Sequence, residues 1–402
     1  MFSNVLKKIK TDYGHTIYAS YIGYITQAIV NNFVPLLFLT FQSQYDISLE
    51  MLGLLVTINF GVQLFVDFIA AKFIDKIGYR TAIVAAHVFS GLGLIGLAVF
   101  PEVLPPYMGI VLAIICYAIG GGILEVLVSP IVEACPTTKK EAAMSLLHSF
   151  YCWGHVFVVL ASTLFFTLAG VENWKWMAVL WAVIPFANGV YFSLVPLAPP
   201  VEEGKGMTIT ELFKSKTFWI LFLLMICSGA SEQGMSQWAS AFAESGLKVS
   251  KTVGDLAGPC LFAVLMGTSR ALYAKLSDKI SLKAAMVGSG CLCISCYVLA
   301  ALAPHPVLGL IGCAVCGFSV GIMWPGTFSL ASNSLPAGGT AMFAFLALAG
   351  DLGCGSGPTI VGAVAEKFGD DLKIGVLSAV VFPVVLVIVN VLLKQEKREQ
   401  HS

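Results

Sequence analysis

The stretch Ala71-Lys72-Phe73-Ile74-Asp75-Lys76-Ile77 returns later in the chain as Ala274-Lys275-Leu276-Ser277-Asp278-Lys279-Ile280. Five of the seven residues are identical, and the copies lie 203 positions apart, about half of the 402-residue chain. Each copy closes a long apolar segment and is followed by another. A charged motif repeated at half the chain length indicates a duplicated helical bundle, with one copy of the motif in each half.

The composition places this bundle in a membrane. Hydrophobic residues make up 57% of the chain and charged residues only 11%, whereas a soluble domain carries about a quarter charged residues. The 23 basic and 23 acidic residues balance, so no basic excess points to nucleic acid. The expected surroundings of most of the surface are therefore lipid.

Apolar runs of span length organise the whole sequence. A bilayer core takes roughly 20 apolar residues per helix, which predicts an all-α membrane protein with twelve transmembrane helices in two pseudo-symmetric six-helix bundles. The expected spans are 16–41, 50–73, 80–100, 105–130, 142–168, 175–195, 217–243, 252–274, 283–303, 306–331, 339–364 and 373–393. The expected domains are a bundle over 1–198, a linker over 199–216 and a bundle over 217–402.

Lys and Arg in the connecting segments predict the orientation, because they favour the cytoplasm. Most of the 23 basic residues fall in segments on one side, which holds both termini and the linker. We therefore expect a multi-pass protein of the cell membrane with cytoplasmic termini, a monomer, and no cleavable signal peptide. Six spans per half give both halves the same orientation.

The loop that begins in the first copy resembles a known signature. Asp75 is followed by Lys76-Ile77-Gly78-Tyr79-Arg80, similar to Gly-x-x-x-Asp-Arg-x-Gly-Arg-Arg of the major facilitator superfamily, although Ala71 and Tyr79 depart from it. The resemblance implies a conformational latch built on Asp75, Arg80 and, in the second copy, Asp278. The alternative is that these are solvated charges that anchor helix ends.

Few charged residues fall inside the spans, where each costs about 2.5 to 3.5 kcal/mol and needs a partner, a cavity or a function. The repeat offset maps Asp67 onto Arg270, so opposite charges occupy equivalent sites in the two halves. We interpret them as a gating or coupling pair with partners on neighbouring helices. The alternative is two structural charges that reach the cytoplasmic interface by snorkelling.

Glu125 lies deep in the fourth span, between Gly120-Gly121-Gly122 and Pro130. The glycines allow close helix approach, and the proline frees a backbone carbonyl beside a cavity. Burial favours the neutral acid, so Glu125 is a candidate substrate ligand and proton carrier. A buried glutamic acid that only bonds a carbonyl is the alternative.

Three segments resemble the fucose:proton symporter family. Gly-Ile-Leu-Glu125-x-x-x-Ser129-Pro is similar to its fourth-helix Gly-x-Leu-Glu-x-x-x-Asn-Pro, with Ser129 in place of the asparagine. The run from Gly321 to Leu330, with Trp324 and Phe328, is similar to its tenth-helix segment. Asn31-Asn32 resembles a first-helix motif whose aspartate is Pro35 in this chain. The resemblance implies sugar transport, usually proton-coupled, while related sodium-dependent glucose carriers share much of the pattern.

Polar clusters on other spans extend the candidate site. Sugars need amide and carboxylate partners for their hydroxyls and an aromatic platform for the ring face. The expected substrate contacts, besides Glu125, Trp324 and Phe328, are Gln27, Asn31, Asn32, His148, Trp153, Glu232, Gln233, Gln237 and Trp238. Asp351, in a glycine-rich stretch of the eleventh span, is a second candidate for ion coupling, with pairing to Arg270 or a structural polar contact as its alternative. An interhelical polar clamp is the alternative for the polar side chains of the seventh span, a membrane-interface position for Trp238, and a packed neutral histidine for His148.

These residues predict a secondary transporter for a monosaccharide, with a proton or sodium ion as the coupled cation. The alternative is a drug or metabolite antiporter of the same fold, whose cavity would be mostly aromatic. No grouping of nucleophile, base and orienting acid lies outside the spans, so an enzyme is not expected. The eleven cysteines are expected to pack as small apolar residues, and we expect no cofactor or metal centre.

Overall fold

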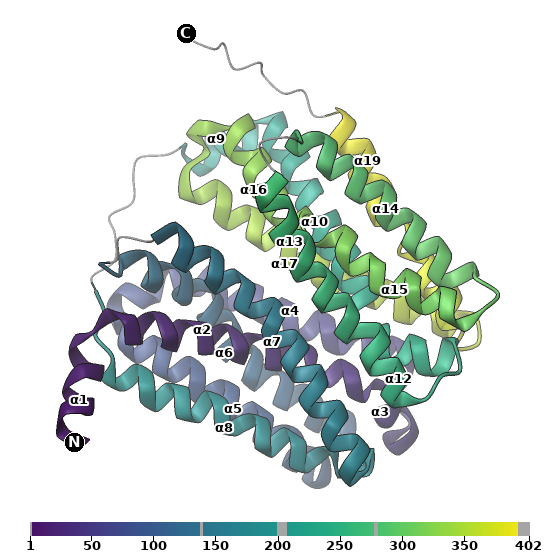
Figure 1. Cartoon of the computed structure of the whole chain (residues 1–402), viewed down its shortest axis with the longest axis horizontal. Helices are drawn as coiled ribbons and strands as arrows, with labels where there is room; N and C mark the ends of the chain where they lie inside the picture. The colour runs from purple at the N-terminus through teal and green to yellow at the C-terminus, as the bar shows by residue number, and fades with distance from the viewer. Residues whose placement is uncertain (1, 137–139, 199–206, 277–279, 393–402) are drawn as a thin grey trace.

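The computed structural model describes residues 2–136, 140–198, 207–276 and 280–392, which form helices and no strand (Figure 1). Twelve segments of these residues are long and apolar enough to cross a membrane, as predicted. They are Tyr13–Tyr45, Leu49–Ile69, Tyr79–Val103, Pro106–Ala134, Leu146–Ala169, Val171–Leu194, Lys216–Ser236, Lys251–Tyr273, Leu282–Leu302, Pro306–Ser334, Met342–Lys367 and Leu372–Leu392.

Several spans are built from more than one helix. The first six comprise α2 (Tyr13–Asn32) with α3 (Phe38–Tyr45), α4 (Leu49–Ile77), α5 (Tyr79–Val103), α6 (Pro106–Ala134), α7 (Lys140–Ala169) and α8 (Trp174–Leu194). The next six comprise α10 (Lys216–Ser236), α12 (Lys251–Asp255) with α13 (Leu261–Leu276), α14 (Leu282–Leu302), α15 (Pro306–Val320) with α16 (Met323–Ser334), α17 (Gly339–Lys367), and α18 (Leu372–Ser378) with α19 (Val381–Leu392). Short helices α1 (Phe2–Thr11), α9 (Ile209–Lys214) and α11 (Ala239–Ala241) lie outside these segments.

The spans pack in two groups. In the first group α5 lies between α6 and α8, and α2 packs on α7; in the second, α10 packs on α19 and α14 on α15. The groups meet chiefly where α4 packs against α17 and α7 against α13. Figure 1 shows the first group in purple to teal and the second in green to yellow.

Glycines set the helix spacing inside each group. A Cβ on Gly93 of α5 would lie 2.4 Å from the backbone nitrogen of Tyr117 on α6. A Cβ on Gly122 of α6 would lie 2.9 Å from the carbonyl oxygen of Gln63 on α4. Neither backbone can move aside cheaply, so these glycines allow the close approach typical of membrane helices.

The first span of each group breaks at the same repeat position. In the first group Pro35, which cannot donate the next helical hydrogen bond, lies in a 3₁₀ turn over Val34–Leu37. In the second group α10 ends at Ser236, and Trp238, equivalent to Pro35 at the offset of 203, follows in a turn. The predicted span 217–243 is therefore too long as one helix.

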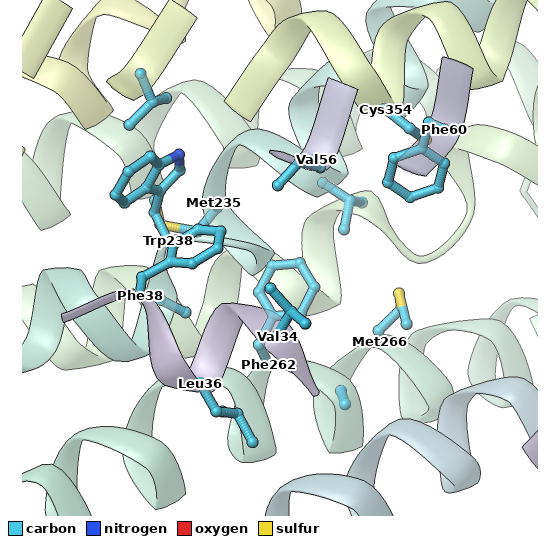
Figure 2. Close-up of a cluster of buried hydrophobic side chains, with 14 of the residues drawn as sticks. Val34, Leu36, Phe38, Val56, Phe60, Met235, Trp238, Phe262, Met266 and Cys354 are labelled. Atoms are coloured by element: carbon cyan, nitrogen blue, oxygen red, sulfur yellow. The ribbon is translucent and has the colours of Figure 1, made fainter. Parts of the chain in front are cut away.

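These broken segments meet in an apolar cluster. Figure 2 shows Trp238 together with Phe38 and Met235, and the rings of Phe38 and Trp238 are 4.9 Å apart. The Trp238 indole also donates a hydrogen bond to the Pro358 carbonyl at 2.9 Å. Irregular backbone at membrane depth is tolerated where protein buries it, as this cluster does.

Among the residues whose side chains are described, hydrogen bonds between the two groups gather at one end of the molecule. Figure 1 shows α1 and α9 at one end, the α1 face, and α3 and α12 at the other, the α3 face. At the α3 face Lys251 donates to the Leu36 carbonyl at 2.7 Å, the Glu50 amide to Glu366 at 2.7 Å, Thr163 to Asp255 at 3.2 Å and Thr57 to the Gly355 carbonyl at 3.0 Å. These bonds close the α3 face.

Candidate functional site

A cavity of about 160 Å³ lies between the two groups of helices. Its lining comes from α2, α4, α6 and α7 on one side and from α10, α13, α16 and α17 on the other. The lining residues are Tyr24, Gln27, Asn31, Phe60, Glu125, His148, Tyr151, Glu232, Gln233, Arg270, Trp324, Asp351 and Cys354. At about 10 to 15 Å³ for each water, the cavity of about 160 Å³ has room for roughly 11 to 16 waters or one small polar solute.

An amide network orients the first-group wall. Gln27 donates through Nε2 to Gln63 Oε1 at 2.7 Å and to Glu125 Oε2 at 3.3 Å. Asn31 Oδ1 accepts from Gln63 Nε2 at 2.9 Å and from Asn59 Nδ2 at 3.0 Å. These bonds fix the amides before any ligand arrives, which lowers the entropy cost of binding.

A second chain of polar groups crosses from α10 to α2. Gln233 donates to Glu232 Oε1 at 3.1 Å, and Gln237 donates to Gln233 Oε1 at 2.7 Å. Gln237 also donates to the Asn31 carbonyl at 3.2 Å. The polar cluster of the seventh span thus lines the cavity through Glu232 and Gln233 and joins the groups through Gln237.

Arg270 supplies the positive charge of the cavity wall. Its Nε donates to the Gly321 carbonyl at 2.9 Å, and its Nη1 lies 3.3 Å from Cys152 Sγ on α7. Glu232 interacts favourably with Arg270. This electrostatic interaction balances one acid of the cavity, and no ion pair of the described residues involves the other acids.

Three acids form a separate cluster at the cavity. Asp67 on α4, Glu125 on α6 and Asp351 on α17 each place one carboxylate oxygen within 4.8 Å of the others. Asp351 is 3% exposed. Within the described chain, Asp67 Oδ1 and Asp351 Oδ2 have no hydrogen-bond partner.

The structure brings together seven of the predicted substrate contacts. Those that line the cavity are Gln27, Asn31, Glu125, His148, Glu232, Gln233 and Trp324. Gly350 leaves room for Trp324, because a Cβ there would lie 2.1 Å from the indole.

Four other predicted contacts lie behind or beyond this lining. Asn32 donates to the Ala28 carbonyl of its own helix at 2.9 Å, and Gln237 lies one turn beyond Gln233. Trp238 is fully buried in the apolar cluster with Phe38. Phe328 packs against Trp324, with ring centroids 6.3 Å apart.

The prediction that Trp153 faces the cavity is wrong. Trp153 is 53% exposed and shares one face of α7 with exposed Phe157, Leu160 and Leu164. It follows His148 by five residues, about 140° around the helix. It therefore lies on the outer surface of the bundle.

The predicted gating residues differ in the contacts that they make. Arg80 donates to the Phe192 and Ser193 carbonyls at 2.8 and 3.0 Å, so its described contacts fasten α5 to α8 within the first group. Asp67 lies beside Glu125 and Asp351, and among the described residues no ion pair joins it to Arg270. The side chain of Asp75 and all of Asp278 lie outside what the structure describes.

Sequence reasoning missed several lining residues, namely Tyr24, Phe60, Tyr151 and Cys354. Tyr24 precedes Gln27 by three residues, and Tyr151 follows His148 by three, so helical spacing from the predicted residues could have found both. The Tyr24 hydroxyl lies 3.1 Å from Ser129 Oγ. Ser129, the residue that differs from the asparagine of the fourth-helix family motif, therefore contacts the cavity wall.

Comparison with known proteins supports this architecture. A family model for the Major Facilitator Superfamily matches residues 20–358. The chain is 25% identical to the membrane protein MosC of Rhizobium meliloti over 314 residues, which cover 75% of this chain and 73% of MosC.

Two solved structures show the same fold at low sequence identity. A bacterial homolog of the human lysosomal transporter Spinster, in an inward-facing and unoccupied conformation, matches with a TM-score of 0.77 at 15% identity, covering 95% of this chain and 97% of that chain. The E. coli fucose:proton symporter matches with a TM-score of 0.63 at 16% identity, covering 94% and 98%. These matches confirm the predicted fold, whereas the narrower resemblance to the fucose family stays a prediction.

Proposed function

The chain belongs to the major facilitator superfamily, whose members are secondary transporters and not enzymes, and we propose that it carries a monosaccharide of hexose type together with a cation. The observation that carries this proposal is the composition of the cavity wall. Amides, carboxylates and a guanidinium converge on a space of about 160 Å³ beside Trp324.

The cavity wall suits a polyol better than an apolar drug. Gln27 and Gln233 offer amide groups, Glu125 and Glu232 offer acceptors, and Arg270 offers donors. Trp324 offers a flat apolar face for a sugar ring. A drug antiporter would be expected to present mostly aromatic walls to its substrate, so the polar share of this lining favours the sugar.

The arrangement of the two groups supports alternating access. We propose that the bundles over 1–198 and 217–402 rock about the cavity, as in other transporters built from two repeats. With the termini in the cytoplasm, as the basic residues predict, the closed α3 face would be the outer one. The protein would then work as a monomer in the cell membrane, with the cavity reached from the cytoplasm in this conformation.

One coupled cation is enough for concentrative uptake. A unit charge that moves through 100 mV gains about 2.3 kcal/mol, and each factor of ten in concentration needs about 1.4 kcal/mol. The expected accumulation is therefore roughly 40-fold. We assign Glu125 and Asp351 to this coupling because both are carboxylates that line the cavity.

Uptake by proteoliposomes tests the proposal. Purified protein is reconstituted, and labelled hexoses are supplied under an imposed proton gradient, a sodium gradient or a membrane potential. We expect saturable uptake of at least one hexose that responds to one of these driving forces. Absence of uptake for every hexose, or uptake that no gradient changes, would contradict the proposal.

The variant Glu125→Gln separates coupling from sugar binding. The amide keeps the shape of the side chain and its contact with Gln27 but removes the charge, so gradient-driven accumulation should fall from roughly 40-fold to none, while exchange of labelled for unlabelled sugar persists. Exposed Glu50, changed to Gln, is the matched control. Full accumulation by Glu125→Gln would remove Glu125 from the mechanism.

A further inference from the structure

We infer that Asp67, Glu125 and Asp351 form one binding site for a hard, oxygen-liganded cation of sodium's size, shared between the two bundles. The inference rests on the proposed function in one respect, namely that this cation is the one coupled to transport. Asp67, which the sequence predicts as a gating or coupling residue with a partner on a neighbouring helix, would then be a ligand of this cation.

The spacing of the three carboxylates fits a cation. Oxygens that all lie within 4.8 Å of one another leave a point about 2.8 Å or less from each, close to the 2.3 to 2.6 Å of calcium–oxygen bonds, and sodium is similar in size. A proton shared by two carboxylates would draw the oxygens to about 2.5 to 2.7 Å. Among the hydrogen bonds of the described chain, none joins any two of these acids, so the spacing favours an ion over a shared proton.

Unsatisfied carboxylate oxygens in the cluster give further support. Asp351 is 3% exposed, and Asp351 Oδ2 and Asp67 Oδ1 have no hydrogen-bond partner in the described chain. Gln27 meets the cluster through its Nε2, which donates to Glu125, while its Oε1 lies close to Gly121. Buried acceptors are nearly always satisfied, and a cation satisfies oxygens that no donor reaches.

The surrounding charges leave the cluster without a counter-ion. Arg270, the basic side chain of the cavity wall besides His148, is tied to the Gly321 carbonyl and Cys152. No described Lys, Arg or His forms an ion pair with Asp67, Glu125 or Asp351. Like charges this close are strongly unfavourable unless a cation or protons neutralise them.

Helix packing holds the cluster together. Gly122 lets α6 contact the backbone of α4 at Gln63, and one helical turn further along lie Glu125 and Asp67. Gly353 lets α17 approach α10 closely, because a Cβ there would lie 2.1 Å from the Ile226 carbonyl oxygen. Asp351 belongs to this tightly packed part of α17.

The site would couple the cation to movement. Asp67 and Glu125 belong to the first bundle and Asp351 to the second, so a cation bound by all three ties the bundles together at the cavity. Separation of the bundles would remove Asp351 from the ion and weaken its binding. This linkage is what a coupled transporter requires, since a ligand shifts a conformational equilibrium only by binding one state better.

Thermal unfolding of the purified full chain tests the site without any sugar. The apparent Tm is measured in detergent with NaCl, LiCl, KCl or CaCl₂ replacing choline chloride at constant ionic strength. A ligand that binds the folded state raises stability with its concentration, so we expect Tm to rise with NaCl in a saturable way. A response to LiCl or CaCl₂ also supports the site, whereas a Tm that only pH changes would overturn it.

Variants decide whether these residues hold the ion. In Asp67→Asn and in Asp351→Asn, the half-maximal sodium concentration should rise at least tenfold. Glu50→Gln, which removes an exposed acid outside the cavity lining, should keep the parent response. If an Asn variant does not fold, Asp351→Glu keeps the charge and should retain a response with altered preference among cations.

A parent-like sodium response in both Asn variants would overturn the site. Failure of hexose uptake would leave this binding result unaffected, because the Tm measurement contains no sugar. Conversely, if the parent protein takes up hexose under a proton gradient but shows no Tm response to any of the cations, this inference is overturned and the proposed function stands.

Discussion

Two buried aspartates in this transporter differ in how they are satisfied. Asp255, fully buried near the α3 face, accepts hydrogen bonds from Lys251 at 3.3 Å, from Thr163 at 3.2 Å and from Ser240. Asp351, equally deep at the cavity, has an oxygen with no partner in the described chain and two acids beside it.

This difference distinguishes a buried carboxylate with a structural role from one with a functional role. A buried carboxylate with a cation and hydroxyl donors is stable in one conformation and stabilises the contacts it makes. A buried carboxylate without them is costly, and we infer that its cost is offset when a cation binds. Burial alone therefore does not identify the coupling residue; the missing partners do.

The largest expected change in stability comes from removing the lysine that pairs with buried Asp255. Lys251→Met leaves the Asp255 carboxylate buried without its counter-charge and removes the bond from Lys251 to the Leu36 carbonyl. Loss of one partner of a buried pair costs about 3 kcal/mol, so apparent Tm should fall whether sodium is present or not. Exposed Lys248, changed to Met, is the control and should have little effect; equal Tm values for the two variants would contradict the account.

A smaller change in stability is expected when the helices that carry Asp67 and Glu125 are forced apart. In Gly122→Ala the new Cβ would lie 2.9 Å from the Gln63 carbonyl oxygen, so α4 and α6 must separate. Overpacking of this kind costs about 1 to 3 kcal/mol, and the sodium response should weaken as well. Gly61 on α4 has open space around it, so Gly61→Ala should be neutral or slightly stabilising, and a similar loss in both variants would count against the packing argument.

The smallest effect concerns an exposed acid. Bonds from the Thr208 amide and hydroxyl, both 2.9 Å, lower the pKa of Glu211 at the start of α9. A lowered pKa in the folded state means that this cap stabilises α9 above the ordinary carboxyl pKa and is lost as pH falls through the lowered value. Hydrogen exchange over Ile209–Lys214 should therefore be slower in the parent than in Glu211→Gln at neutral pH and equal in acid. A difference that persists in acid would show that charge is not the cause.

The sequence was sufficient for the spans and for much of the cavity wall. Long apolar runs predict membrane helices directly, and a polar residue such as Gln27 or Glu232 within them must face protein or a cavity. Glu125 and Asp351 could each be predicted as cavity residues for this reason. The prediction was possible because a carboxylate side chain at these depths cannot face the lipid.

The meeting of Asp67 with Asp351 could not be predicted in the same way. The repeat relates equivalent positions in the two halves, such as Asp67 and Arg270, but contacts between halves depend on helix tilt and rotation, which packing decides. The prediction for Trp153 was wrong for a related reason. Tryptophan is suited both to a sugar-stacking site and to a lipid-facing surface, and only the angle between Trp153 and His148 around the helix distinguishes these positions.

The most direct test measures the apparent Tm of Asp255→Asn and Asp351→Asn side by side with the parent, in choline chloride without sodium. We expect the two variants to shift Tm in opposite directions. Asp255→Asn should lower Tm because Lys251 loses its partner, and Asp351→Asn should raise it because one of three clustered charges is gone. A fall of similar size in both variants would contradict the central claim that Asp351 belongs to an unsatisfied cation site.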